Sequence, residues 1–222
     1  MESRARIGNP ERVRIKICGL RNFHDAQAAW EAGADVLGFN GYVQSSRYLD
    51  LNQAKSWLQD VPPWIGRWAV LVNPTEEVCH QLWESGCFEA LQLHGDESPA
   101  FCDRLKDAGI RVVKALRPRS VEEFQMIGQQ WGPDVLVDAS VPGVYGGSGH
   151  TADWNAVKNL VAAQPKLRVI LAGGLTSENV GEAIDLVRPF AVDVAGGVES
   201  EPGCKDAAKM HAFVAAVRHN AR

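Results

Sequence analysis

The stretch that decides the fold is Val13-Arg14-Ile15-Lys16-Ile17-Cys18-Gly19. Its first five residues are a short, mainly apolar run, Cys18 ends that run, and the turn residue Gly19 follows at once. A helical pattern comes next, and strand-like and helix-like segments then alternate to the end of the chain. In a closed ring of such units, the residue at the carboxyl end of a strand points into the mouth of the active site. We therefore expect Cys18 at such a mouth, where its thiol could transfer protons, act as a nucleophile or merely fill space.

Eight runs rich in Val, Ile, Leu and Phe are predicted to be strands. Several of them are almost continuously apolar, as is typical of buried parallel strands. Strand starts recur about every 20 to 35 residues, the size of a βαβ unit. The predicted strands cover residues 13–17, 35–39, 65–72, 88–93, 111–116, 134–137, 167–171 and 190–194.

Capping residues support the helices between these strands. Asn22 and Thr75 are predicted N-caps, Ser120 with Glu123 forms a capping box, and Ser177 marks the seventh helix. The pattern predicts an α/β fold, a single-domain (β/α)8 TIM barrel over residues 1–222, with residues 1–11 as a flexible N-terminal extension. A doubly wound open sheet is the alternative, which eight repeats and the lack of GxGxxG after the first strand disfavour.

Composition excludes several classes of protein. The 222 residues are 45% hydrophobic and carry a net charge of −4 without a Lys/Arg run, which argues against nucleic-acid binding. The charged first ten residues do not resemble a signal peptide, and no apolar run approaches the length of a membrane span. Five cysteines without a CxxC pair fit a reducing cytoplasm, and the scattered histidines predict no metal site.

Two matched glycine turns follow the seventh and eighth strands. Gly173-Gly174 comes after the first of these strands and Gly196-Gly197 after the second. The loops at these places are the usual phosphate seat of the barrel, because glycine lets backbone N–H groups approach a ligand closely. The alternative is that the glycines end strands and admit close packing. Their occurrence at both positions favours a phosphate site.

Asp138 ends the sixth strand and is a candidate partner for Cys18. A carboxylate is costly to bury without a purpose or a partner, although it could also cap a loop. An acid and a base on opposite strands make a proton-transfer pair. Asp193 is a weaker candidate and could be a structural partner. Lys16 would share a side with Cys18 only if the strand is regularly pleated.

Two long connections would share the mouth with Cys18, one after the second strand and one after the sixth. Arg47 lies in the first of them, where its guanidinium could hold a substrate carboxylate bidentately. His94 ends the fourth strand and is either a site residue or a satisfied strand-end histidine; the site is favoured. No motif places a histidine to activate Cys18, which disfavours the nucleophile role.

Taken together, the residues resemble the phosphoribosylanthranilate isomerase family of tryptophan biosynthesis, nearly from end to end. Each motif is weak alone, but the ordered set is specific. The motifs are Lys16-Ile17-Cys18-Gly19, Gly33-Ala34-Asp35 with Gly38-Phe39, Ser45-Ser46-Arg47, Gln92-Leu93-His94-Gly95, Tyr145-Gly146-Gly147-Ser148-Gly149 with Asp153-Trp154, Ala172-Gly173-Gly174-Leu175 with Asn179-Val180, and Asp193-Val194 with Gly197-Val198-Glu199 and Pro202-Gly203.

The resemblance implies a cofactor-free Amadori rearrangement of N-(5-phospho-D-ribosyl)anthranilate to 1-(2-carboxyphenylamino)-1-deoxy-D-ribulose 5-phosphate. It implies that Cys18 is the general base at ribose C2 and Asp138 the general acid at the ring oxygen. It also implies that Arg47 binds the anthranilate carboxylate. The substrate-binding set is completed by His94, Gly147, Gly173, Gly174, Gly196 and Gly197.

The chain departs from the family pattern in two places. Asn40-Gly41-Tyr42-Val43 stands where bulky apolar or aromatic residues, often with a proline, are usual after Gly38-Phe39, so we expect a more polar and more flexible loop. Ala195-Gly196 stands where two serines are usual, which removes a hydroxyl contact to phosphate. Both departures predict weaker substrate binding than is usual in the family.

Two alternatives remain open at this point. One is a related isomerase acting on a different aminoaldose phosphate, and the other is a non-catalytic phosphosugar-binding paralogue. We expect a monomer or a homodimer with a small phosphorylated aminosugar as its partner.

Overall fold

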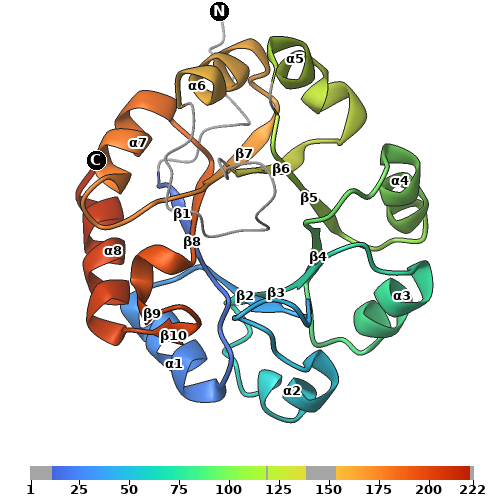
Figure 1. Cartoon of the computed structure of the whole chain (residues 1–222), viewed down its shortest axis with the longest axis vertical. Coiled ribbons are helices and arrows are strands. Elements are labelled where there is room, and N and C mark those ends of the chain that lie inside the picture. Colours follow the sequence, from blue (N-terminus) through green and yellow to red (C-terminus); the bar gives the residue numbers. More distant parts are fainter. Residues whose placement is uncertain (1–11, 119, 139–153, 221–222) are drawn as a thin grey trace, which may run out of the picture.

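The computed structural model of the chain describes residues 12–118, 120–138 and 154–220. These residues form a closed eight-stranded parallel barrel in which each strand pairs with the next along the chain and β8 pairs with β1 (Figure 1). The predicted barrel is therefore confirmed, and the open sheet is excluded. No helix within the described ranges is long and apolar enough to cross a membrane.

Strands and helices alternate around the ring. The barrel strands are β1 (Arg14–Cys18), β2 (Val36–Asn40), β3 (Gly66–Leu71), β4 (Ala90–Leu93), β5 (Val112–Leu116), β6 (Asp134–Asp138), β7 (Arg168–Ala172) and β8 (Ala191–Val194). The helices are α1 (Phe23–Ala32), α2 (Leu51–Leu58), α3 (Glu76–Glu84), α4 (Pro99–Asp107), α5 (Val121–Gln130), α6 (Trp154–Ala163), α7 (Val180–Val187) and α8 (Ala207–Asn220).

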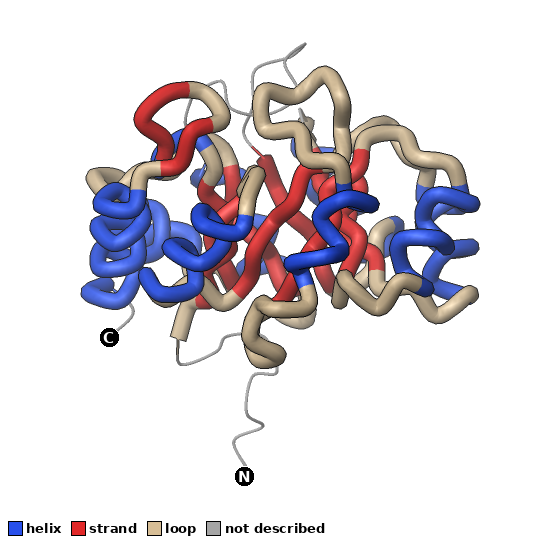
Figure 2. Tube along the Cα trace, turned by 90° about the horizontal axis from the view of Figure 1, so that it is seen from below, coloured by secondary structure: helices blue, strands red, loops and turns tan. Residues whose placement is uncertain are grey.

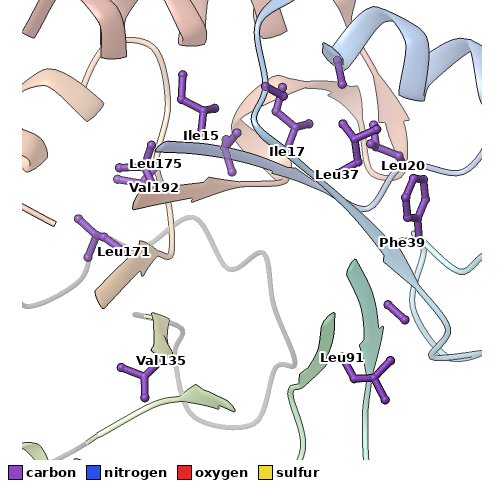
Figure 3. Packing of buried hydrophobic residues seen from close by; sticks show 14 of the residues in the cluster. Ile15, Ile17, Leu20, Leu37, Phe39, Leu91, Val135, Leu171, Leu175 and Val192 are labelled. Carbon is purple, nitrogen blue, oxygen red and sulfur yellow. The ribbon is translucent and has the colours of Figure 1, made fainter. Parts of the chain in front are cut away.

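The pleat of β1 is regular, and this places its side chains on two faces. Ile15 and Ile17 point away from the inside of the ring and belong to the large apolar cluster beneath the helices (Figure 3). Lys16 and Cys18 alternate with them and therefore face inward. Because the strand is regularly pleated, Lys16 and Cys18 lie on the same side of it.

The inside of the barrel is filled mainly by small and branched side chains. Interior side chains of a barrel stack in layers contributed by alternate strands, so small residues in the upper layers leave room at the mouth. The second apolar cluster, separate from the one beneath the helices, consists of Ala90, Val113, Ala115, Leu136, Ile170, Ala172 and Ala191, with Trp68 and Phe190 packed against it.

Local sequence signals determine where most of the helices begin. The side chains of Asn22, Thr75 and Ser120 each accept a hydrogen bond from the backbone N–H three residues on, as expected of N-caps. The boundary expected at Ser177 is wrong, because α7 begins at Val180. Asn179 instead ties the preceding loop together: its side chain accepts from Thr176 N and donates to the carbonyl of Gly174.

A small hairpin on the rim was not predicted. It consists of β9 (Glu199–Glu201) and β10 (Cys204–Lys205), which pair antiparallel, and it stands apart from the barrel strands (Figure 2). Each strand is very short, and the Pro202-Gly203 turn lies between them, so the sequence pattern does not reveal them. The hairpin follows β8 and carries Glu199 and Lys205 to the edge of the mouth.

Candidate active site

A cavity of about 490 Å³ opens at the carboxyl ends of the barrel strands. It gathers residues from β1, β2, β3, β6, β7 and β8 and from the loops that follow β2, β4, β7 and β8. Gly147 lies outside the described residues. The other predicted site residues all line this cavity: Cys18, Arg47, His94, Asp138, Gly173, Gly174, Gly196 and Gly197.

Cys18 is buried beside an ion pair. Lys16 Nζ donates to Asp193 Oδ1 at 2.8 Å, and both side chains are almost inaccessible to solvent. The thiol of Cys18 lies next to the same ammonium. Gly38, opposite Cys18 on β2, leaves the necessary space: a Cβ there would lie 2.7 Å from the sulfur and 2.9 Å from Lys16 Nζ.

The charges around Cys18 oppose one another. Burial raises the pKa of the thiol above its ordinary value; the ammonium of Lys16 lowers it, the carboxylate of Asp193 raises it, and the balance is a raised pKa. For Lys16, burial is the largest single influence and would lower the pKa, but the interactions with Asp193 and Cys18 together outweigh burial and leave the pKa raised. Lys16 is therefore a charged neighbour that favours the thiolate.

Asp138 is oriented by a short chain of side chains. His94 Nε2 lies 3.2 Å from Asp138 Oδ2, and His94 Nδ1 lies 3.1 Å from the amide nitrogen of Gln92. An amide nitrogen only donates, so Nδ1 accepts and Nε2 carries the hydrogen that is donated to Asp138. Arg117 Nε lies 3.8 Å from the same carboxylate oxygen. These contacts hold the carboxyl group of Asp138 in place at the wall of the cavity.

The two glycine loops lie side by side. A Cβ on Gly197 would stand 2.0 Å from the carbonyl oxygen of Leu175, so this glycine is required for the close approach of the loops. Gly173 and Gly174 have φ of 96° and 66°, a region that favours glycine. Packing thus explains part of the pattern. Between described residues, none of the backbone hydrogen bonds outside helices and strands is donated by the N–H groups of these glycines or of Gly196, which makes these groups candidates for binding an anion.

Arg47 reaches the cavity with one edge of its guanidinium already occupied. Its Nε and Nη2 donate to the two carboxylate oxygens of Glu199 at 2.7 and 2.6 Å. The sequence did not predict this partner. Lys205 Nζ also donates to Glu199, at 2.6 Å, so this carboxylate has two cationic neighbours.

The loop after β2 uses its polar residues internally. Asn40 accepts from the N–H of Tyr42 and donates to Ser45 Oγ, and Ser45 Oγ in turn accepts from the N–H of Arg47. The space that a side chain at Gly41 would need is filled by Leu51, whose Cδ1 would lie 2.8 Å from the added Cβ. The polar loop is therefore a hydrogen-bonded turn that leads to Arg47.

The sequence undervalued the charged residues around the cavity. Lys16 was left undecided, Asp193 was ranked below Asp138, and Glu199 and Lys205 had no assigned role. A charged residue within an apolar strand, two positions from a site residue, is the signal that could have found Lys16. Among the described residues, no group of three or more His, Cys, Asp or Glu side chains is arranged to hold a metal ion.

The chain is similar to known proteins along nearly its whole length. The family model described as N-(5'-phosphoribosyl)anthranilate isomerase matches residues 15–216. The N-(5'-phosphoribosyl)anthranilate isomerase of Pseudomonas putida strain F1 is 42% identical over 208 residues, which cover 93% of this chain and 98% of that protein.

Solved structures agree. The phosphoribosyl anthranilate isomerase of Thermotoga maritima has a TM-score of 0.84 at 35% identity, covering 93% of this chain and 99% of that chain. A phosphoribosyl anthranilate isomerase in complex with reduced 1-(o-carboxyphenylamino)-1-deoxyribulose 5-phosphate has a TM-score of 0.80 at 34% identity, with the same two coverages of 93% and 99%.

Proposed function

The chain belongs to the N-(5'-phosphoribosyl)anthranilate isomerase family of tryptophan biosynthesis, and we propose that it performs the family's rearrangement with Cys18 as base and Asp138 as acid. The observation that carries this proposal is that the two side chains, from β1 and β6, line the same cavity as the glycine loops and Arg47. The substrate is a small aminosugar phosphate that also carries a carboxylate.

The proposed reaction begins with ring opening. Asp138 donates its proton to the ring oxygen of the ribose, the bond from C1 to that oxygen breaks, and the electron pair stays on the oxygen as a hydroxyl. The anthranilate nitrogen supplies its lone pair to C1 and becomes an iminium. The hydrogen bond from His94 Nε2 keeps the carboxyl group of Asp138 directed into the cavity.

Isomerisation then follows at C2. The thiolate of Cys18 removes the proton from C2, the C–H electrons form a C1–C2 double bond, and the iminium electrons return to nitrogen. The resulting enolamine tautomerises to the ketone: C1 gains a proton and the C2 hydroxyl loses one. Each of the two proton-transfer groups is expected to contribute about 10²–10⁴-fold to the rate.

Binding of the two ends aligns the sugar between acid and base. We assign the phosphate to the backbone N–H groups of the loops after β7 and β8, and the anthranilate carboxylate to Arg47. Remote binding energy of this kind is used to position the reacting carbon. We further propose that the protein acts in the cytoplasm, which its five free thiols support.

The test is genetic rescue combined with an activity assay. The unmutated protein should restore growth without tryptophan to a bacterial strain that lacks this isomerase, and purified protein should convert the substrate. Cys18→Ala and Asp138→Asn should fold but fail in both assays. Failure of the well-expressed unmutated protein would reject the function, and full activity of either variant would reject that residue's role.

A further inference from the structure

Glu199 occupies only one edge of the Arg47 guanidinium. The contact is side-on and uses Nε and Nη2, so both N–H groups of Nη1 and one of Nη2 take no part in it. One N–H of Nη1 and the remaining N–H of Nη2 form the end-on edge, and the second N–H of Nη1 points to the opposite side. A ligand carboxylate can therefore pair with Arg47 end-on while Glu199 stays in place.

Lys205 connects this pair to the loop after β8. Its Nζ donates to Glu199 Oε1 at 2.6 Å and to the carbonyl of Ala195 at 2.9 Å. The side chains of Lys205, Glu199 and Arg47 are 0%, 4% and 14% exposed. Charge-assisted hydrogen bonds in such a shielded place are short and strong, so they hold the groups at a set spacing.

The surroundings leave Arg47 little freedom. A Cβ on Gly19 would lie 2.4 Å from Arg47 Cδ, so the side chain runs directly over this glycine. At its tip, Nη2 lies 3.4 Å from where a Cβ on Gly196 would stand. The guanidinium therefore lies against the loop that is proposed to bind phosphate.

The charges of the cluster favour an ionised Glu199. Burial would raise the pKa of this carboxyl group, but the hydrogen bond from Arg47 and the charge of Lys205 outweigh burial and lower the pKa. Two cations and one anion leave a net charge of one positive unit at the rim. Without Glu199, two cationic side chains would face each other with little solvent between them.

We propose that Glu199 and Lys205 are a positioning pair that fixes the distance between the carboxylate-binding end of Arg47 and the phosphate-binding loop after β8. The site then selects aminosugar phosphates whose N-aryl group carries a carboxylate at that spacing. This inference rests on the proposed function, and it adds a specificity device to it.

The test compares two ligands that differ by one carboxyl group. They are reduced 1-(o-carboxyphenylamino)-1-deoxyribulose 5-phosphate and its phenylamino counterpart, and the readout is Kd by calorimetry. A charge-assisted hydrogen bond is worth roughly 1.5–3 kcal/mol, so the unmutated protein should prefer the carboxylated ligand by about 10- to 150-fold.

Glu199→Asp separates spacing from charge, because it keeps the carboxylate but withdraws it by one methylene. In this variant and in Glu199→Gln, we expect the ratio of the two Kd values, which measures the preference for the carboxylated ligand, to fall at least about tenfold. The Kd of the phenylamino ligand should change less than about threefold. Lys205→Met should act in the same direction. Glu182→Gln, an exposed charge change on α7, is the matched control and should change neither Kd.

The outcomes separate the two proposals. Equal weakening of both ligands in the Glu199 variants, or an unchanged preference in Glu199→Asp, would overturn the positioning role alone. Tighter binding of the carboxylated ligand by Glu199→Gln would also overturn it, because Glu199 would then be a competitor for Arg47. Failure of the unmutated protein to bind either ligand would overturn the proposed function and this inference with it.

Discussion

Lys16 and Cys18 meet in the space left by a missing side chain. Both point inward from β1, and the sulfur and the ammonium nitrogen lie 2.7 and 2.9 Å from where a Cβ on Gly38 would stand. The proposed base therefore has its cationic neighbour only because β2 carries a glycine at this register position.

Gly38→Ala should damage activity more than stability. The added methyl group would also lie 3.1 Å from the backbone Cα of Cys18, so the thiol, the ammonium or the strand must shift. We expect kcat/KM to fall at least about 100-fold, since small misplacements of a reacting group cost that much. Overpacking should lower the free energy of unfolding by about 1–3 kcal/mol.

The control for this variant is Gly66→Ala. Its added Cβ would lie 3.3 Å from a methyl group of Val36, at the start of β3 and far from the mouth. Activity should stay near that of the unmutated protein. Normal kcat/KM in folded Gly38→Ala would contradict the proposed geometry of the base.

Lys16→Met should move the pH dependence of the reaction upward. The pKa of Cys18 is already raised by burial, and Lys16 is the main group that lowers it. A base works only when ionised, so kcat/KM should rise with pH until the thiol titrates. Loss of the ammonium should shift this limb to higher pH, and the rate of alkylation by iodoacetamide should shift with it.

A double variant, Lys16→Met/Asp193→Asn, tests the effect of Lys16 on the stability of the fold. Lys16→Met leaves the Asp193 carboxylate buried without its cation, which costs about 3–5 kcal/mol. Lys16→Met/Asp193→Asn removes that charge and should recover much of the stability. An unchanged pH profile and alkylation rate in the single variant would show that Lys16 only supports the fold.

Substitutions in the loop after β8 should change phosphate binding in opposite directions. Gly197→Ala places a Cβ 2.0 Å from the carbonyl oxygen of Leu175 and must push the loops apart, so KM should rise. Gly196→Ser adds a Cβ that would lie 3.4 Å from Arg47 Nη2, an ordinary contact, and a hydroxyl that can donate to phosphate, so KM should fall by about three- to tenfold, the value of one hydrogen bond.

Steady-state kinetics and the Kd for inorganic phosphate would measure both effects. They would also test the expectation that this chain binds substrate more weakly than is usual in its family. If Gly196→Ser leaves KM and the phosphate Kd unchanged, then the missing hydroxyl is not a cause of weak binding.

Gln92→Leu should disturb the orientation of His94. Gln92 is fully buried, and its amide nitrogen sets the tautomer in which His94 Nε2 donates to Asp138. Loss of this hydrogen bond, worth about 1 kcal/mol, should lower kcat about five- to tenfold. The ¹⁵N chemical shifts of the His94 ring should show mixed tautomers. A single unchanged tautomer with reduced kcat would mean that Gln92 acts in another way.

Local sequence determined much of this protein. Apolar runs of strand length, capping residues such as Asn22 and the repeating βαβ spacing depend on neighbours along the chain, so they predict the barrel. In a barrel the carboxyl ends of all strands meet on one face, and for this reason the sequence by itself places Cys18, Asp138 and the glycine loops at one mouth.

Only the tertiary structure decided which charges pair at that mouth. Lys16 and Asp193 are 177 residues apart in the sequence, and Arg47 and Glu199 are 152 apart. Ring closure between β1 and β8 brings the first pair together, and the hairpin after β8 brings Glu199 to Arg47. Local patterns do not specify such partners, because ion pairing depends on distance and burial in the closed ring.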